Sequence, residues 1–371
     1  MQRKIEVENM SKRMIVVFPS RNFTFSGIYN VTEDLHNGLI KEKIDHELIL
    51  VIINKEFAEP NFECRKVILS NFKNIFTRSV YFLIPDDYEL IDYLYDNAIY
   101  DYNIMIWSHY FKGHRMIFSE YNDKVKHKSL SELNVKFAHD FLPYFIWRRF
   151  VYKYVNYLKK NVLIAQSIWS CLLLNRVYSL NCQRIVSLPV DLKYFRDNNA
   201  DENKALIFIG GKLDTDLNKL NHVLSIINEI SEDIKYNVIG DQQIFDQFNK
   251  KSLANLTFRS NVSRADLQDL ISKAKFTINP IFLGTFEMFP IESLICGTPV
   301  ITFIQPFLEV IGETTLVSYI DSDSDIISKF IKWKNDNLEE EKKRIKGIIK
   351  VKMNANTIAK NIYSIMEGEF S

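Results

Sequence analysis

The chain has 371 residues, 47% of them apolar and 25% charged, so it can form two domains with full cores and is not disordered. Its 47 Lys and Arg residues nearly balance 46 Asp and Glu residues, which argues against nucleic-acid partners held by overall charge. Four scattered cysteines favour neither zinc nor disulfides and fit a cytoplasmic protein. We expect no signal peptide and no membrane span, because no apolar stretch approaches about eighteen residues.

In the first half, short apolar runs alternate with longer amphipathic stretches. Continuous apolar runs, without alternating polar residues, indicate parallel strands that are covered on both faces. The predicted strands are residues 14–19, 47–53, 80–84, 104–107, 116–119, 135–139, 163–166 and 184–188. This half therefore predicts a Rossmann-like α/β domain.

Residues 144–160 have helical spacing and carry five basic, seven aromatic and no acidic residues. Three interpretations stay open for this segment. It is a core-packed helix with a solvated basic side, a peripheral membrane contact that docks on anionic lipid, or a binding site for nucleic acid or another polyanion.

A polar segment at 187–204 separates the first series of strands from a second one. The second series has strands at 205–210, 236–240, 256–258, 276–280, 299–303 and 316–320, with helices at 216–230 and 263–274 between them. We expect an N-terminal domain at 1–190, a linker at 191–204, a C-terminal domain at 205–352 and a helix at 353–371 that packs back on the first domain. In such sheets ligands bind beyond the carboxyl ends of the strands, so the candidate site is the cleft between the domains.

The stretch GTFEMFPIESLICGTPVITF, residues 284–303, predicts a loop, a helix over 289–295 and a following strand. Gly297 is placed to end the helix in the left-handed conformation. A helix that begins directly after a loop directs free backbone N–H groups and its positive dipole end at that loop. This arrangement suits a phosphate or another anion.

The whole pattern resembles the GT-B glycosyltransferases, specifically family 4 of the nucleotide-sugar-dependent enzymes. The similar segments, in family order, are MIVVFPSRNFTFSGIYNVTEDLHNGLI, VKFAHDFLPYF, NVLIAQSIWSCLLLN, SLPVDLKYF, LIFIGGKLDTDLNKL, YNVIGD, LTFRSNVSRADLQDLISKAKFTINP and FEMFPIESLICGTPVI. The resemblance implies two Rossmann-like domains and transfer of a sugar from a nucleotide sugar to a hydroxyl of a glycan, lipid-linked or other acceptor. It also implies retention of configuration and no required cofactor.

The resemblance places most donor-binding residues in the second domain. Glu292 would bind the ribose hydroxyls, since a carboxylate accepts from two neighbouring hydroxyls at once. Lys212 stands where the family has an arginine for the phosphates, and Lys219 lies near the usual lysine; for both, a surface lysine is the alternative. The other expected donor contacts are Gly27, Gly211, Gly284, Thr285, Phe286 and Met288.

The expected catalytic residues are His139, Asp140 and Glu287. By resemblance His139, at the end of an apolar strand, faces the donor sugar, and Asp140 orients it or the acceptor; a packed histidine is the alternative. The family's second glutamate is replaced here by Gly284. Glu287 would then reach the sugar from a shifted loop, or would serve only as an acid favoured near a helix start.

An Asp-x-Asp at 214–216 would hold a metal ion in another glycosyltransferase fold. Its position between a strand and a helix instead predicts Asp216 as a helix N-cap, and we expect no required metal. Three other functions stay open. They are a non-catalytic GT-B subunit that binds glycan or a partner transferase, a sugar-nucleotide epimerase, and a transferase that acts on modified DNA bases.

Overall fold

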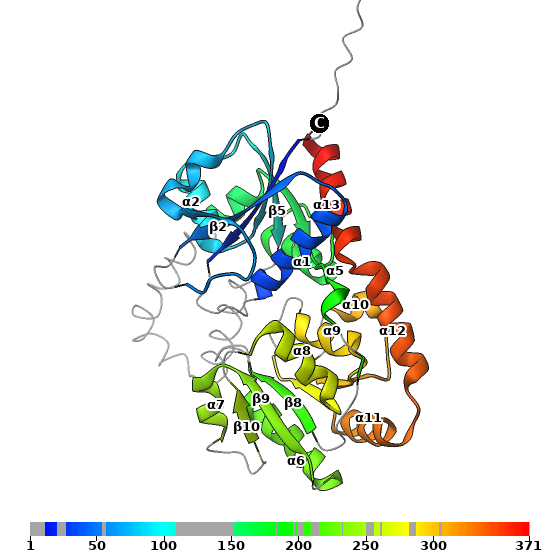
Figure 1. Cartoon of the computed structure of the whole chain (residues 1–371). Helices are drawn as coiled ribbons and strands as arrows, with labels where there is room; N and C mark the ends of the chain where they lie inside the picture. Colours follow the sequence, from blue (N-terminus) through cyan, green and yellow to red (C-terminus); the bar gives the residue numbers. More distant parts are fainter. Residues whose placement is uncertain are drawn as a thin grey trace, which may run out of the picture.

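The computed structural model shows two α/β units joined through a long C-terminal helical segment (Figure 1). Each unit is a parallel sheet with the helices that cover it, and the two are called the first and second layer below. It describes residues 12–20, 27–53, 57–108, 152–182, 184–195, 197–198, 204–209, 215–231, 233–249, 256–259, 262–281, 287–303 and 306–370.

Seven parallel strands of the described residues form the first sheet, in the order β3-β2-β1-β4-β5-β6-β7. They are β1 (Met14–Pro19), β2 (His46–Ile52), β3 (Arg65–Ile68), β4 (Tyr81–Pro85), β5 (Asn103–Ser108), β6 (Val162–Ala165) and β7 (Arg184–Ile185). Met14 at the start of β1 pairs with His46 on one side and Tyr81 on the other. The central strands β1, β4 and β5 are buried along almost their full length, as continuous apolar runs predict.

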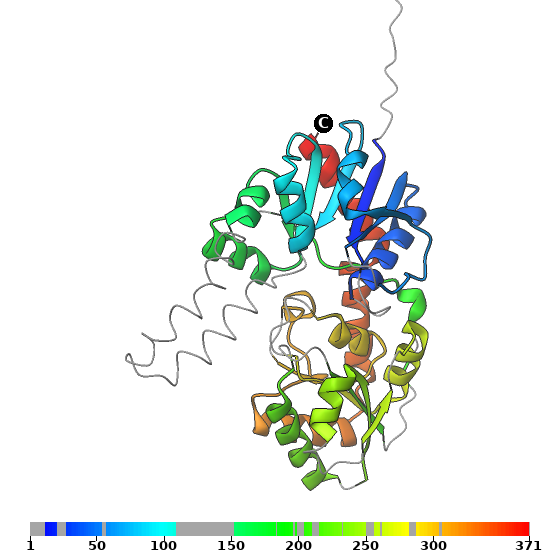
Figure 2. The same cartoon turned by 90° about the vertical axis from the view of Figure 1, so that its left-hand side faces the viewer.

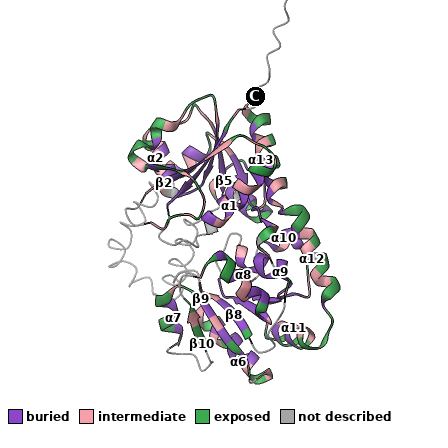
Figure 3. Cartoon of the chain, viewed as in Figure 1, coloured by how far each residue is buried: buried purple, intermediate pink, exposed green. Residues whose placement is uncertain are grey.

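Helices cover both faces of this sheet, so that its strands are purple in Figure 3. One face packs against α1 (Gly27–Lys41) and α13 (Ala355–Phe370). The other face packs against α2 (Tyr88–Asp96), the helix at 152–158 and α5 (Ile168–Tyr178). The short 3-10 helix at Leu69–Ile75 follows the edge strand β3.

The second sheet, again within the described residues, has six parallel strands in the order β10-β9-β8-β11-β12-β13. They are β8 (Lys204–Ile209), β9 (Lys235–Gly240), β10 (Leu256–Arg259), β11 (Phe276–Asn279), β12 (Val300–Thr302) and β13 (Val317–Tyr319). One face carries α6 (Leu217–Ile230), α7 (Gln242–Asn249) and α11 (Asp323–Asn335). The other face carries α8 (Arg264–Lys273) and α9 (Met288–Ile295), with α10 (Leu308–Ile311) and α12 (Glu339–Lys352) beyond them.

The chain passes between the two sheets twice, and the two crossings lie side by side. Val190 follows the first sheet, and Asn354 joins α12 to α13; the two residues form a parallel bridge. The N–H of Val190 donates to the carbonyl of Met353 at 2.8 Å, and the N–H of Ala355 donates to the carbonyl of Val190 at 3.2 Å. The continuous run of α12 and α13 along both layers is visible in Figure 2. The C-terminal helix thereby becomes part of the first layer.

The fold class predicted from the sequence is confirmed, because both sheets are parallel and covered by helices on both faces. One predicted strand was too long and one strand was missed. The strand predicted at 184–188 is reduced to β7, and β3 was missed because only Val67 of its four residues is buried. An edge strand of this kind lacks an apolar run. The strands predicted at 116–119 and 135–139 lie outside the described residues.

The described part of the helix predicted at 144–160 packs against the first sheet. Tyr157 and Leu158 are buried in the cluster on that face. Lys153 and Lys160 both contact the protein itself. Lys153 forms ion pairs with Asp92 and Asp96, at 3.0 and 2.7 Å. The ammonium group of Lys160 lies 3.9 Å from the ring centroid of Tyr100. These contacts favour the core-packed interpretation for residues 152–160.

Candidate functional site

The strand order of the second sheet locates a ligand-binding edge. The order reverses between β8 and β11, and open α/β sheets bind ligands beyond the carboxyl ends of the strands at such a point. β8 ends at Ile209 and β11 at Asn279. The chain returns at Thr215, which forms an antiparallel bridge with Ile281. The segments that follow the two central strands therefore meet at this edge.

Helix α9 begins at the same edge, with a proline in its first turn and a glycine at its end. Pro290 is its third residue, a position in the first turn where no intrahelical N–H is lost. At the other end Gly297 has a φ of 77°. Its N–H donates to Leu294 at 3.0 Å, and the N–H of Thr298 donates to Ser293 at 2.9 Å. This is the left-handed helix end predicted for Gly297, and it is confirmed.

Glu292, in the second turn of α9, is a buried carboxylate with 4% of its surface exposed. Within the described residues no hydrogen bond to its side chain is found, and its carboxylate oxygens are not among the fully enclosed unpaired atoms, so a ligand can reach them. Burial raises the pKa of Glu292 to about 7, while the charge of Arg264 lowers it and that of Asp34 raises it. A buried carboxylate that lacks donors is unfavourable unless something supplies them. Glu292 is therefore suited to accept hydrogen bonds from a ligand.

Arg264 in α8 joins the two layers next to Glu292. Its guanidinium donates to both carboxylate oxygens of Asp34 in α1, at 2.7 and 2.6 Å, and to Glu33 at 3.2 Å. Burial raises the pKa of Asp34 to about 6, although the hydrogen bond and charge of Arg264 lower it. Three carboxylates thus surround one cation. The sequence prediction missed this pair, whose members are 230 residues apart, but an arginine on the apolar face of α8 was a detectable signal.

A second polar contact between the layers lies at the N-terminus of α5. Ser167 caps this helix by accepting from the N–H of Ser170 at 3.0 Å. The carboxylate of Glu309, in α10, accepts from the N–H groups of Ile168 and Trp169 at 2.6 and 2.8 Å. An acid at a helix N-terminus is stabilised by the helix dipole. No sequence signal identifies this contact.

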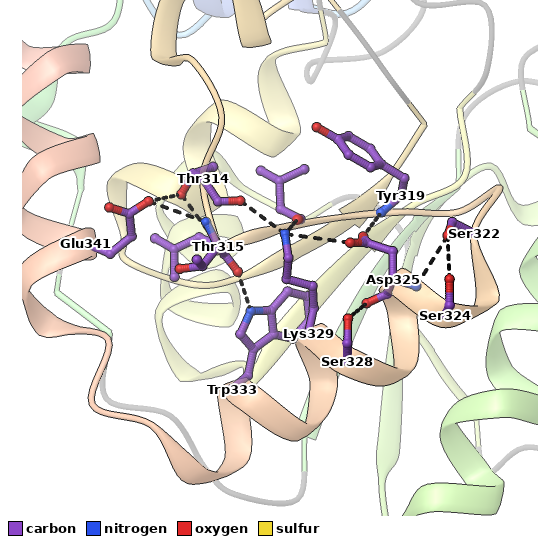
Figure 4. Close-up of polar contacts among 12 residues, drawn as sticks. Thr314, Thr315, Tyr319, Ser322, Ser324, Asp325, Ser328, Lys329, Trp333 and Glu341 are labelled. Atoms are coloured by element: carbon purple, nitrogen blue, oxygen red, sulfur yellow. Dashed lines mark hydrogen bonds and ion pairs between the residues drawn. The ribbon is translucent and has the colours of Figure 1, made fainter.

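The outer strand β13 is short and is fixed by side chains from α11 and α12 (Figure 4). Lys329 donates to the carbonyl of Val317 at 2.9 Å, and the indole N–H of Trp333 donates to the carbonyl of Thr315 at 2.7 Å. Glu341 accepts from the N–H of Thr315 at 3.4 Å. These contacts hold the amino end of β13, at the opposite end of the strands from the candidate ligand-binding edge.

Several predicted site residues lie outside the described part of the chain. They are His139, Asp140, Gly211, Lys212, Gly284, Thr285 and Phe286. The described residues nearest to the last five, Ile209, Thr215, Ile281 and Glu287, all lie at the edge where β8 and β11 end.

The remaining predicted residues occupy distinct positions. Gly27 is the first residue of α1. Glu287 directly precedes α9, with extended backbone and no capping hydrogen bond from its side chain, and Met288 begins the helix. Lys219 lies in α6 and forms an exposed ion pair with Asp321 at 3.1 Å. This pair gives Lys219 a partner within the protein, and its donor-binding role stays a prediction.

Asp216 is the N-cap of α6, as predicted. Its carboxylate accepts from the N–H groups of Asn218 and Lys219 at 3.1 and 3.0 Å. In the described residues no three His, Cys, Asp or Glu side chains lie together as ligands for a metal ion. None of the helices there is long and apolar enough to cross a membrane.

Comparisons with known proteins agree with this architecture. Residues 203–336 match the family model described as glycosyl transferases group 1. The fold is that of the GT-B glycosyltransferases, as two similar solved structures show. Sucrose-phosphate synthase from Thermosynechococcus elongatus has a TM-score of 0.69 at 14% identity, covering 97% of this chain and 99% of that one. Trehalose-6-phosphate synthase has a TM-score of 0.64 at 8% identity, covering 96% and 99%.

A third similar structure is an alpha-glucosyltransferase in complex with UDP and a 13-mer DNA containing an HMU base. Its TM-score is 0.62 at 11% identity, covering 96% of this chain and all of that one. No curated protein matches the chain by sequence.

Proposed function

We propose that this chain is a glycosyltransferase that moves a sugar from a nucleotide-sugar donor to a hydroxyl acceptor. The observation that carries the proposal is Glu292, a buried carboxylate without a hydrogen-bond donor at the ligand-binding edge of the second sheet. Ribose hydroxyls would supply the missing donors. The match of residues 203–336 to a glycosyltransferase family model includes this position and supports the assignment.

In this proposal the diphosphate lies at the N-terminus of α9, where free backbone N–H groups and the helix dipole favour an anion. Lys212 adds a positive charge that stabilises the leaving diphosphate. His139, Asp140 and Glu287 face the transferred sugar. Transfer retains the anomeric configuration, the diphosphate helps to deprotonate the acceptor on the same face, and no metal is required.

The first experiment is a thermal-shift screen of UDP, ADP, GDP and their sugar conjugates. A ligand at about 100 times its dissociation constant adds roughly 2.7 kcal/mol of stability. UDP and UDP-glucose head the panel because similar structures are described with UDP. Glu292→Ala is expected to abolish the shift. Glu341→Gln is the control, since Glu341 is fixed at the opposite edge of the sheet. A panel without any stabilising nucleotide contradicts the proposal.

Release of nucleoside diphosphate with and without acceptors then tests for transfer. A protein that binds the donor but never releases diphosphate is the non-catalytic subunit that Gly284 suggests. A protein that changes the sugar without an acceptor is an epimerase. Activity that survives EDTA supports the absence of a metal requirement.

Transfer to modified DNA bases is a second candidate, because one similar structure is solved with DNA that carries an HMU base. A duplex with the same base serves as acceptor. Salt-sensitive binding of this duplex together with diphosphate release identifies it as the substrate. Diphosphate release with saccharide acceptors alone excludes it.

A further inference from the structure

Two buried polar side chains at the carboxyl edge of the second sheet have no partner. Asn279 is the last residue of β11 and Thr302 the last residue of β12, and the two pair in the strand register. Both side chains are fully buried. Within the described part of the chain, the amide nitrogen and oxygen of Asn279 form no hydrogen bond, and neither does the hydroxyl of Thr302. Buried polar groups are nearly always paired, so this cluster requires an explanation.

Both side chains lie on the face of the second sheet that α9 covers. Thr277 lies two residues before Asn279 and therefore on the same face of β11, and its hydroxyl donates to Ser293 of α9 at 3.0 Å. Asn279 is nearer the carboxyl edge, where α9 begins. On the neighbouring strand Phe208 stacks on Phe289 of α9, with ring centroids 5.0 Å apart. Asn279 and Thr302 are therefore on the α9 side of the sheet, at the end of the strands where α9 begins.

The chemistry of the pair distinguishes between an anion and a neutral polyol. A phosphate would accept a hydrogen bond from the amide nitrogen of Asn279 but would leave its carbonyl oxygen unpaired in a buried place. A sugar hydroxyl can donate to that oxygen, and a second one can accept from the nitrogen. The hydroxyl of Thr302 also donates and accepts. The cluster is therefore complementary to vicinal hydroxyls.

We propose that Asn279 and Thr302 bind hydroxyl groups of the transferred sugar and help to determine which sugar this protein accepts. The inference rests on the proposed function, and it extends the site by one subsite. Glu292 holds the nucleoside end, the N-terminus of α9 holds the diphosphate, and the Asn279–Thr302 pair contacts the sugar at the carboxyl ends of β11 and β12. Both residues are positioning groups that take no part in the bond exchange.

The test compares UDP-glucose with UDP, or the pair that binds best in the screen, by calorimetry. We expect Asn279→Leu and Thr302→Val to raise the dissociation constant of the nucleotide sugar at least tenfold and to change that of the diphosphate less than twofold. Thr302→Ser retains the hydroxyl and is expected to bind the nucleotide sugar as the unchanged protein does. Because apolar replacements remove unpaired buried groups, both first variants should also melt at higher temperature without ligand.

Ser318→Ala is the matched control. Its hydroxyl is also buried and has no partner within the described chain, but Ser318 pairs with Ile301 and lies on the opposite face of the sheet. This variant should bind both ligands as the unchanged protein does. Equal losses for nucleotide sugar and diphosphate, or no loss for either, overturn the sugar subsite. If the unchanged protein binds no nucleotide, the proposed function itself is wrong.

Discussion

Arg264 and Asp34 form a bidentate ion pair between α8 of the second layer and α1 of the first, with N–O distances of 2.7 and 2.6 Å. Only 7% of Arg264 and 1% of Asp34 is exposed. The charge of Arg264 also lowers the pKa of Glu292. The contact between the layers and the candidate nucleotide site therefore share one side chain.

The first prediction concerns this pair. Arg264→Met leaves Asp34 buried and uncompensated, and it is expected to lower the free energy of unfolding by about 3–5 kcal/mol. The double variant Arg264→Met with Asp34→Leu removes both charges and should recover most of that loss. Urea unfolding followed by circular dichroism measures both. A single variant within about 0.5 kcal/mol of the unchanged protein contradicts the prediction.

The second prediction concerns pH. The pKa of Glu292 is raised from 4.5 to about 7, so the folded state takes up its proton more readily than the unfolded state. The stability that Glu292 contributes to the ligand-free protein is therefore present below about pH 4.5 and lost as the pH rises to about 7. Nucleotide binding needs the carboxylate and should follow the opposite trend, with a dissociation constant about tenfold higher at pH 6 than at pH 8.

Calorimetry with the same nucleotide and Glu292→Gln provides the control. The amide does not titrate, so the pH dependence left in this variant comes from the phosphate of the ligand and from Asp34, whose pKa is raised to about 6 by burial. Identical pH profiles for the unchanged protein and Glu292→Gln would mean that Glu292 does not titrate in this range or does not contact the ligand.

The third prediction concerns the contact of α1 with α13. A methyl group at Gly38 would collide with the carbonyl of Ala355, a backbone atom that has little freedom to move. Gly38→Ala is expected to destabilise the protein by about 1–3 kcal/mol. Gly347 in α12 has open space around it, so Gly347→Ala should stabilise by up to about 1 kcal/mol. Thermal unfolding of both variants tests the pair, and a loss of stability in both would show that the close approach is not the cause.

The fourth prediction concerns Glu309 at the N-terminus of α5. Glu309→Gln keeps one acceptor but removes the charge, and it should cost about 0.3–1 kcal/mol at low ionic strength. The difference should shrink in 1 M salt, where exposed charges are screened within about 3 Å. Glu313→Gln, an exposed acid in the following turn, serves as control. A loss that is independent of salt would point to packing and not to charge.

Local sequence patterns predicted most of the fold. The continuous apolar runs of the central strands, the N-cap at Asp216 and the stop at Gly297 depend on neighbouring residues, and all three are confirmed. The edge strand β3 was missed because its exposed residues carry no apolar pattern.

The contacts that surround the candidate site depend on residues far apart in the chain. The predicted role of Glu292 came from a family resemblance, whereas its partner charges Arg264 and Asp34 come together only when the two layers pack. The absence of partners at Asn279 was equally invisible, since a sequence shows that a side chain is polar but not whether it is satisfied.

The bridge between Val190 and Asn354 has a consequence for dissection of the molecule. Separately expressed halves, cut within the linker, would leave the first half without α13, and Leu39 and Tyr81 would lose part of their apolar cover. A peptide that spans Ala355–Phe370 should therefore rescue the folding of a fragment that ends near Val190 by complementation in trans. The two halves of the fold are thus units in space but not separable segments of the chain.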